Sequence, residues 1–218
     1  MRIAIVGGHG KVALELHPLL ARAGHTPLAL VRSEDYRTEL EALGAEVGLL
    51  DIEAQDADGF AAAFAGCDAV VFTAGGGPDG NIERKRTVDL EGSTKSIAGA
   101  ETAGIRRFVQ VSAIGADEPV PEDAAEVWKA YVAAKRDADV AVRASGLDWT
   151  ILRPGTLIDE PATGLVSLGA KLERGSIPRA DVAAVVAAVL DEEATIGKQW
   201  DLVSGDASVG DAIAAATS

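Results

Sequence analysis

The stretch Val6-Gly7-Gly8-His9-Gly10-Lys11-Val12-Ala13 indicates the fold of the whole chain. It follows a short apolar run, Arg2–Val6, and it opens a helical period over Lys11–Ala23. A glycine-rich turn between a first strand and a first helix is typical of the phosphate-binding turn of dinucleotide-binding folds. In such a turn the backbone N–H groups at the helix start meet the phosphate charge, and the helix dipole strengthens this attraction.

Three positions of the stretch fall at the spacing G-x-x-G-x-x-A. Gly7 allows the tight turn out of the strand, Gly10 lets the backbone approach a pyrophosphate, and the small Ala13 lets the helix pack close to the sheet. We expect His9 to hydrogen-bond a phosphate. The alternative is a glycine-rich turn without a ligand, and the strand-to-helix context favours the ligand.

Short apolar runs alternate with helical periods along the rest of the chain. The candidate strands are Arg2–Val6, Pro27–Val31, Glu46–Leu50, Ala69–Thr73, Phe108–Val111, Thr150–Leu152 and Gln199–Val203. The candidate helices are Lys11–Ala23, Glu34–Leu43, Ala57–Phe64, Ile82–Ala103, Asp123–Ser145 and Arg179–Leu190, with a short helix at the C-terminus. Strands that are apolar on both faces indicate a parallel sheet covered by helices on both sides. The pattern predicts an α/β fold with a doubly wound, mostly parallel sheet, the Rossmann fold.

The length of 218 residues suits one domain spanning 1–218, and we expect residues 155–218 to form a small extension on the substrate side. Within it, Asp159–Ile177 is rich in Gly, Pro and Thr and lacks periodicity, which predicts a mobile substrate loop. The glycine-rich segment Gly75–Gly80 is predicted to be a loop at a strand end.

The composition narrows the function. Acidic residues number 34 against 20 basic residues, a net charge of −14, so we expect no nucleic-acid or membrane partner. A single cysteine, Cys67, cannot form an internal disulfide and reads as a small buried residue, and no Cys/His cluster indicates a metal site. No targeting or membrane segment is visible, so we expect a soluble cytoplasmic protein. We expect it to be a monomer or a homodimer.

The end of the second predicted strand favours one cofactor. NAD-binding proteins usually carry Asp or Glu there for the ribose hydroxyls, whereas this chain has Leu30-Val31-Arg32-Ser33. The guanidinium of Arg32 suits a 2′-phosphate, and Ser33 adds a hydroxyl donor. We therefore predict NADP, with NADPH preferred over NADH. Glu34 and Asp35 follow directly, and either would restore NAD binding if the loop turned.

Nine segments in register resemble the atypical short-chain dehydrogenases/reductases, in the NAD(P)H-binding Rossmann group that includes epimerase- and dehydratase-like members. They are Gly7–Ala13, Leu30–Arg32, Leu50–Ile52, Val70–Gly75, Val88–Gly92, Arg107–Ser112, Tyr131 with Lys135, Ile151–Gly155 and Arg179–Ala183. The motifs and this resemblance imply cofactor contacts at Gly7, His9, Gly10, Lys11, Val12, Arg32, Ser33, Asp51, Ile52, Ala74, Gly75, Val111, Lys135, Pro154, Gly155 and Leu157. Asp51 and Ile52 are implied to flank the adenine.

The resemblance also implies a catalytic set of Tyr131, Lys135 and Ser112. Tyr131 and Lys135 lie at i and i+4, on one face of a helix. In reductases of this family the lysine lowers the pKa of the phenol and binds the nicotinamide ribose, and the tyrosine transfers a proton. The usual catalytic hydroxyl aligns nearer Ala113 than Ser112, and Asp89 stands where related enzymes often have Asn. The position of the hydroxyl argues against efficient carbonyl reduction, whereas Asp at position 89 is common in the group that the chain resembles.

Three functions follow from this set. The first is NADPH-dependent reduction of a small carbonyl or quinone-like substrate. The second is a non-catalytic NADPH-sensing regulator, which Ala113 favours. The third is a sugar-nucleotide epimerase or dehydratase, which the short C-terminal part disfavours. Among the histidines, His17 and His25 are expected at the surface.

Overall fold

The computed structural model describes residues 1–77 and 80–218, so Pro78 and Asp79 of the predicted Gly75–Gly80 loop lie outside the described residues. In this part of the chain nine strands form one sheet, in the order β11-β8-β10-β6-β5-β4-β1-β2-β3. The parallel strands are β1 (Arg2–Val6), β2 (Thr26–Val31), β3 (Glu46–Leu49), β4 (Ala69–Phe72), β5 (Arg107–Val111), β6 (Asp148–Pro154) and β10 (Lys198–Ser204). The antiparallel strands at one edge are β8 (Leu165–Gly169) and β11 (Ala207–Ser208). A separate ladder pairs β7 (Thr156–Ile158) with β9 (Ser176–Pro178).

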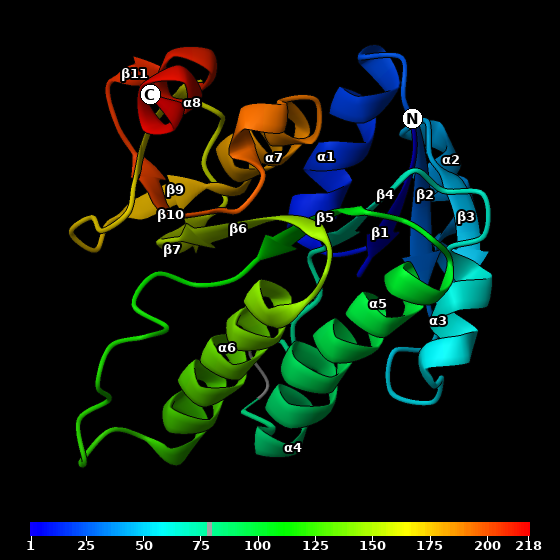
Figure 1. Cartoon of the computed structure of the whole chain (residues 1–218), viewed down its shortest axis with the longest axis horizontal. Coiled ribbons are helices and arrows are strands. Elements are labelled where there is room, and N and C mark those ends of the chain that lie inside the picture. Colours follow the sequence, from blue (N-terminus) through cyan, green and yellow to red (C-terminus); the bar gives the residue numbers. More distant parts are fainter. Residues whose placement is uncertain (78–79) are drawn as a thin grey trace.

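Helices cover both faces of the sheet (Figure 1). They are α1 (Lys11–Arg22), α2 (Arg37–Ala42), α3 (Ala57–Ala63), α4 (Ile82–Arg84), α5 (Glu91–Thr102), α6 (Glu126–Ala144), α7 (Arg179–Leu190) and α8 (Val209–Thr217). Two 3-10 turns, Glu34–Tyr36 and Glu193–Thr195, and a π-helix, Lys85–Leu90, complete the described elements. The order β3-β2-β1-β4-β5-β6 is that of the Rossmann fold, and the strand order reverses between β1 and β4. The predicted fold class is confirmed.

Alternation along β1 explains the two helical layers. Ile3 and Ile5 belong to the core on the side of α1 and α7, whereas Ala4 and Val6 belong to the core on the side of α3 and α5. All four side chains are fully buried. A strand between two such layers is apolar at every position, which is the pattern that the sequence shows.

The predicted helix Ile82–Ala103 is wrong in one respect, because a π-helix interrupts it at Lys85–Leu90. Asp89 in this segment accepts a hydrogen bond from the Gly76 amide, and Lys85 donates to the Gly77 carbonyl. Both side chains are buried and turned toward the loop after β4. π-helices are frequent at functional sites. Here the π-helix directs both Lys85 and Asp89 to hydrogen-bond the loop after β4.

The predicted mobile loop Asp159–Ile177 is also wrong, because it contains β8 and most of β9. β8 lies antiparallel between β10 and β11, and Val166 at its centre is fully buried. The strand is short, so glycine and threonine around it hide its periodicity. Among the residues after 155, β8, β10 and β11 thus extend the same sheet.

Candidate functional site

A hollow of about 300 Å³ lies at the carboxyl ends of β1, β2, β3 and β4. Ligands of open α/β sheets bind at this edge, beside the point where the strand order reverses. The predicted cofactor residues that line the hollow are Gly7, His9, Gly10, Arg32, Asp51, Ile52, Ala74 and Gly75. Half of the residues that the sequence predicts to contact the cofactor therefore line this hollow.

The turn after β1 runs very close to the neighbouring strands. Gly7 has φ +83°, and a Cβ added there would lie 2.8 Å from the Cα of Ala74. A Cβ at Gly8 would lie 2.8 Å from the Cα of Ala29, although the sequence motif does not single out this glycine. Glycine is required at both positions because backbone, not a flexible side chain, fills the space.

The first turn of α1 presents amides rather than side chains. Gly10 is the N-cap and makes no side-chain cap, and no acidic residue lies in the first turn. The N–H groups of the first turn of a helix have no acceptor within that helix. Together with the helix dipole they favour an anion such as a pyrophosphate.

His17 was expected at the surface, but it is buried and contacts the backbone of the turn after β1. Its side chain is fully buried, and Nε2 lies 2.7 Å from the Gly8 carbonyl oxygen. Burial lowers the pKa of His17, so the neutral ring donates Nε2–H to the carbonyl. The prediction failed because His17 shares the inward face of α1 with Ala13, Leu16 and Leu20.

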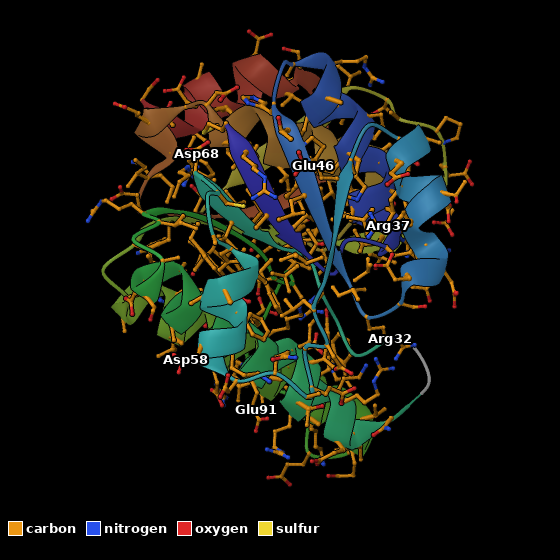
Figure 2. All side chains as sticks on the ribbon, turned by 90° about the vertical axis from the view of Figure 1, so that its right-hand side faces the viewer. Arg32, Arg37, Glu46, Asp58, Asp68 and Glu91 are labelled. Atoms are coloured by element: carbon orange, nitrogen blue, oxygen red, sulfur yellow. The ribbon has the colours of Figure 1, made fainter. Side chains whose placement is uncertain are left out.

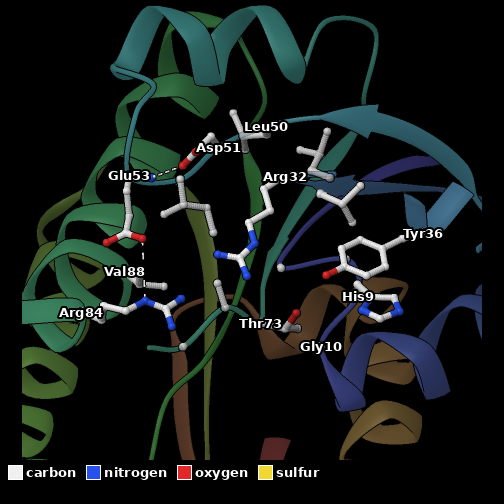
Figure 3. Close-up of a pocket in the computed structure, with 17 residues that line it drawn as sticks. His9, Gly10, Arg32, Tyr36, Leu50, Asp51, Glu53, Thr73, Arg84 and Val88 are labelled. Atoms are coloured by element: carbon white, nitrogen blue, oxygen red, sulfur yellow. Dashed lines mark hydrogen bonds and ion pairs between the residues drawn. The ribbon is translucent and has the colours of Figure 1, made fainter. Parts of the chain in front are cut away.

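Arg32 extends beyond the carboxyl end of β2, at the opposite end of the sheet from Glu46 and Asp68 (Figure 2). Its exposed guanidinium points into the hollow (Figure 3), and it forms no hydrogen bond or ion pair with the described residues. Ser33 does not line the hollow, because its hydroxyl donates to Asp35 Oδ2 and caps the following turn.

Acidic groups near the hollow are already engaged. Asp51 Oδ1 accepts hydrogen bonds from the amides of Glu53 and Ala54. Glu53 accepts a hydrogen bond from the Thr87 hydroxyl and lies 3.7 Å from Arg84 Nε. Beyond β2, Glu34 pairs with Arg37 at 2.6 Å, and the hydrogen bond from this guanidinium lowers the pKa of Glu34.

His9 lies in the turn after β1, and its ring contacts Tyr36 and Glu39. It stacks on Tyr36 with ring centroids 3.7 Å apart, and Nε2 lies 2.8 Å from Glu39 Oε2. The stack forms one wall of the hollow (Figure 3). The expected bond from His9 to a phosphate thus competes with Glu39.

Several expected cofactor residues lie outside the hollow. Lys11 forms an ion pair with Asp159 at 2.6 Å, and Val12 is buried in the core. The Val111 carbonyl accepts a hydrogen bond from Lys135. Of the remaining three, Pro154 is the last residue of β6, Gly155 follows it, and Leu157 lies in β7.

The catalytic set lies deeper in the molecule. Lys135 is 5% exposed, and its Nζ lies 3.1 Å from Asp89 Oδ1. Burial raises the pKa of Tyr131; Lys135 opposes this rise, and the charges of Asp89 and Asp139 add to it. Lys135 thus acts on the pKa of the phenol in the expected direction, but the effect of burial is larger, and the pKa of Tyr131 is raised.

Ser112 is buried and donates its hydroxyl to Asp139 Oδ2 at 2.8 Å. Asp139 is fully buried and also accepts hydrogen bonds from Gln110 and Arg153. Burial raises the pKa of this carboxyl, against the opposing effect of Arg153. A hydroxyl engaged in this way does not polarise a substrate carbonyl in the arrangement described.

The hollow is also lined by residues that the sequence did not assign to the cofactor: Gly8, Leu30, Val31, Tyr36, Leu50, Glu53, Thr73, Arg84 and Val88. Thr73 directly precedes Ala74 and Gly75, so its place in the sequence could have indicated that it lines the hollow. Tyr36, Glu53 and Arg84 come from segments whose approach to the hollow depends on the packing of the sheet.

Within residues 1–77 and 80–218, no group of three His, Cys, Asp or Glu residues could hold a metal ion. In the same residues no helix has the length and apolar character needed to span a bilayer.

A family model described as NAD(P)H-binding matches residues 7–193. The chain belongs to this NAD(P)H-binding family. It is 42% identical over 214 residues to YhfK of Bacillus subtilis, an uncharacterized sugar epimerase, covering 98% of this chain and 99% of that protein. A Bacillus halodurans structure assigned to the NAD-dependent epimerases/dehydratases has a TM-score of 0.92 at 38% identity and covers 99% of both chains. ChuY, an anaerobillin reductase from Escherichia coli O157:H7, has a TM-score of 0.80 at 28% identity, covering 95% of this chain and 99% of that one. The resemblance to atypical short-chain dehydrogenases/reductases is confirmed.

Replacing Gly7 by Ala tests the close approach of the turn. Gly24→Ala is a matched control, because Gly24 also has φ +83° but meets nothing within 4 Å. The control should lose about 1–2 kcal/mol of unfolding free energy from backbone strain. Gly7→Ala should lose about 1–3 kcal/mol more because of the clash with Ala74. Chemical denaturation measures both, and equal losses would contradict the proposed crowding.

Replacing His17 by Gln tests the buried neutral imidazole. The pKa of His17 is lower in the folded chain than in the unfolded chain, so below about pH 6.5 the unfolded chain binds a proton that the folded chain does not. The contribution of His17 to stability is therefore full above this pH and is lost as the pH falls. Relative to His17→Gln, the wild type should lose up to about 1.4 kcal/mol between pH 8 and pH 5.5. Denaturant unfolding at both pH values measures this; a stability difference independent of pH would refute it.

Proposed function

We propose that the protein is an NADPH-dependent oxidoreductase that reduces a small carbonyl or quinone-like substrate. The observation that carries the cofactor preference is the guanidinium of Arg32, which points into the hollow and forms no ion pair with the described residues. A 2′-phosphate gives this cation two or more charge-assisted hydrogen bonds. No carboxylate takes the position that an NAD ribose would need at the end of β2.

The described residues fit such a dinucleotide. The crowded glycine turn and the uncapped start of α1 would hold the pyrophosphate. Ile52 and Val88 would pack on the adenine, and Ala74 and Gly75 would let the ribose lie against the backbone. The reductase activity in the name of ChuY supports the same class of reaction.

NADPH, when bound, supplies a hydride to the carbonyl carbon of the substrate. Tyr131 would give its phenolic proton to the carbonyl oxygen, so that an alcohol forms and the tyrosinate regains its proton from water. Because burial raises the pKa of Tyr131, the phenol stays protonated at neutral pH, as a proton donor requires. Trp128, whose ring centre lies 5.5 Å from that of Tyr131 and which is 41% exposed, would flank the substrate.

A second candidate is an NADPH-sensing regulator without turnover. The hydrogen bond from Ser112 to Asp139 favours it, because it withdraws the hydroxyl that would polarise a carbonyl. An epimerase or dehydratase of sugar nucleotides, suggested by the name of YhfK, is less favoured, since the part of the chain after residue 155 is short and supplies edge strands of the sheet together with α7 and α8.

Replacing Arg32 by Ala tests the cofactor assignment. NADPH affinity should fall about 10- to 100-fold, the equivalent of the lost charge-assisted hydrogen bonds, and NADH affinity should change less than about twofold. Arg22→Ala is the matched control, because Arg22 is also exposed but lies at the far end of α1. Fluorescence titration with both nucleotides measures the constants. Tighter binding of NADH by the wild type would refute the assignment, and binding of neither nucleotide would refute the whole proposal.

Replacing Tyr131 by Phe separates the enzyme from the sensor. In the enzyme, NADPH oxidation with a panel of quinones and aldehydes should slow about 10²- to 10⁴-fold, while NADPH affinity is retained. In a sensor, neither protein turns over and both bind NADPH equally. A variant that reduces the panel as fast as the wild type would exclude Tyr131 as the proton donor.

A further inference from the structure

A pair of stacked rings joins the glycine turn to the segment after β2. The ring of His9, in the turn, lies nearly parallel to the ring of Tyr36, with centroids 3.7 Å apart and planes 14° apart. Tyr36 ends the 3-10 turn Glu34–Tyr36 and comes four positions after Arg32. In dinucleotide-binding folds the glycine turn holds the pyrophosphate, and the end of the second strand contacts the 2′ position of the ribose. The stack therefore borders the place where a 2′-phosphate would lie.

The ring of Tyr36 is held in place by its neighbours. It packs against a small core cluster that consists of Ala29, Val31, Leu40 and Ala45. It also stacks on His9, and His9 Nε2 lies 2.8 Å from Glu39 Oε2. A side chain that is already fixed by packing loses little further freedom when it binds a ligand.

The hydroxyl group of Tyr36 points into the hollow (Figure 3). It forms no hydrogen bond with any residue in the ranges 1–77 and 80–218. The guanidinium of Arg32 points into the same hollow. A phenolic O–H that donates to a phosphate oxygen makes a short hydrogen bond, stronger than one between neutral groups.

The other hydroxyl groups near the hollow are engaged. Among the described residues that line it, Thr73 is the second that carries a hydroxyl, and Thr73 Oγ1 donates to the Val6 carbonyl at 3.1 Å. Ser33 does not line the hollow and donates to Asp35. Tyr36 therefore has the hydroxyl that is available to a ligand here.

His9 is less suited to donate to a phosphate itself. A carboxylate only accepts hydrogen bonds, so the neutral ring of His9 carries its proton on Nε2, toward Glu39. The other ring nitrogen, Nδ1, then has a lone pair and no proton to donate. In this tautomer His9 contributes its stacked ring.

We propose that Tyr36 is a second residue that determines the preference for NADPH, because its hydroxyl donates a hydrogen bond to the 2′-phosphate that Arg32 binds. His9 acts through Tyr36 and is a positioning residue, which keeps the ring in the orientation that the hydrogen bond requires. NADH has a neutral 2′-hydroxyl instead, which is a weaker acceptor. This inference rests on the proposed function.

Tyr36→Phe tests the hydroxyl alone, since the variant keeps the ring and its stack. The Kd for NADPH should rise about 10-fold, which corresponds to one lost hydrogen bond to a charged group, whereas the Kd for NADH should change less than about twofold. Fluorescence titration of the wild type and the variant with both nucleotides measures the ratio of the two constants. Circular dichroism checks that the variant is folded.

A double-mutant cycle tests the role of His9. His9→Leu removes the stacked ring, and in the wild-type background it should raise the Kd for NADPH relative to NADH about three- to tenfold. In the Tyr36→Phe background the same change should alter this ratio less than about twofold, because the hydroxyl that His9 orients is gone. Losses that multiply in the double variant would show that His9 binds the phosphate independently, and would overturn its positioning role.

A Tyr36→Phe variant that keeps the wild-type ratio of the two constants would overturn the proposal, whether both constants stay unchanged or both rise together. The proposed function fails in a different way. A wild type that binds NADH more tightly than NADPH, or binds neither, refutes it before any variant is compared. A wild type that prefers NADPH, with an unchanged Tyr36→Phe variant, leaves the proposed function standing and removes only the role of Tyr36.

Discussion

The turn between β1 and α1 lies so close to β2 and to the segment after β4 that Gly7 and Gly8 have no room for a side chain. This contact fixes the path of the backbone into α1 and places the uncapped amides of its first turn at the edge of the sheet. His17 holds the same turn from the core through the Gly8 carbonyl. The hollow exists because these backbone segments meet where the strand order reverses.

Charge around the hollow contrasts with charge on the molecule. The chain carries a net charge of −14, yet the acidic groups nearest the hollow are engaged by turn amides, hydroxyls or guanidinium groups. Arg32 remains for an anion, beside the amides of α1. A negative protein can therefore bind a negative dinucleotide, because net charge describes the surface as a whole and a site depends on its local groups.

Local sequence patterns predicted the fold because each strand and its turn are encoded within a few residues. The glycine spacing, Arg32 after β2 and Ala74 with Gly75 after β4 were all found at the hollow. What failed depends on contacts between distant segments. From the π-helix, Lys85 approaches the ring of Tyr131 and Asp89 forms an ion pair with Lys135. The periodicity of the sequence predicts neither the π-helix nor this ion pair.

We infer that the turn after β1 and Arg32 together bind the cofactor. Amide and side-chain NMR spectra of the ¹⁵N-labelled protein, recorded during addition of NADPH, test it most directly. We expect the largest changes in chemical shift on the amides of residues 7–13 and on the Arg32 guanidinium. Saturable changes confined to another part of the surface, or no change at all, would contradict it.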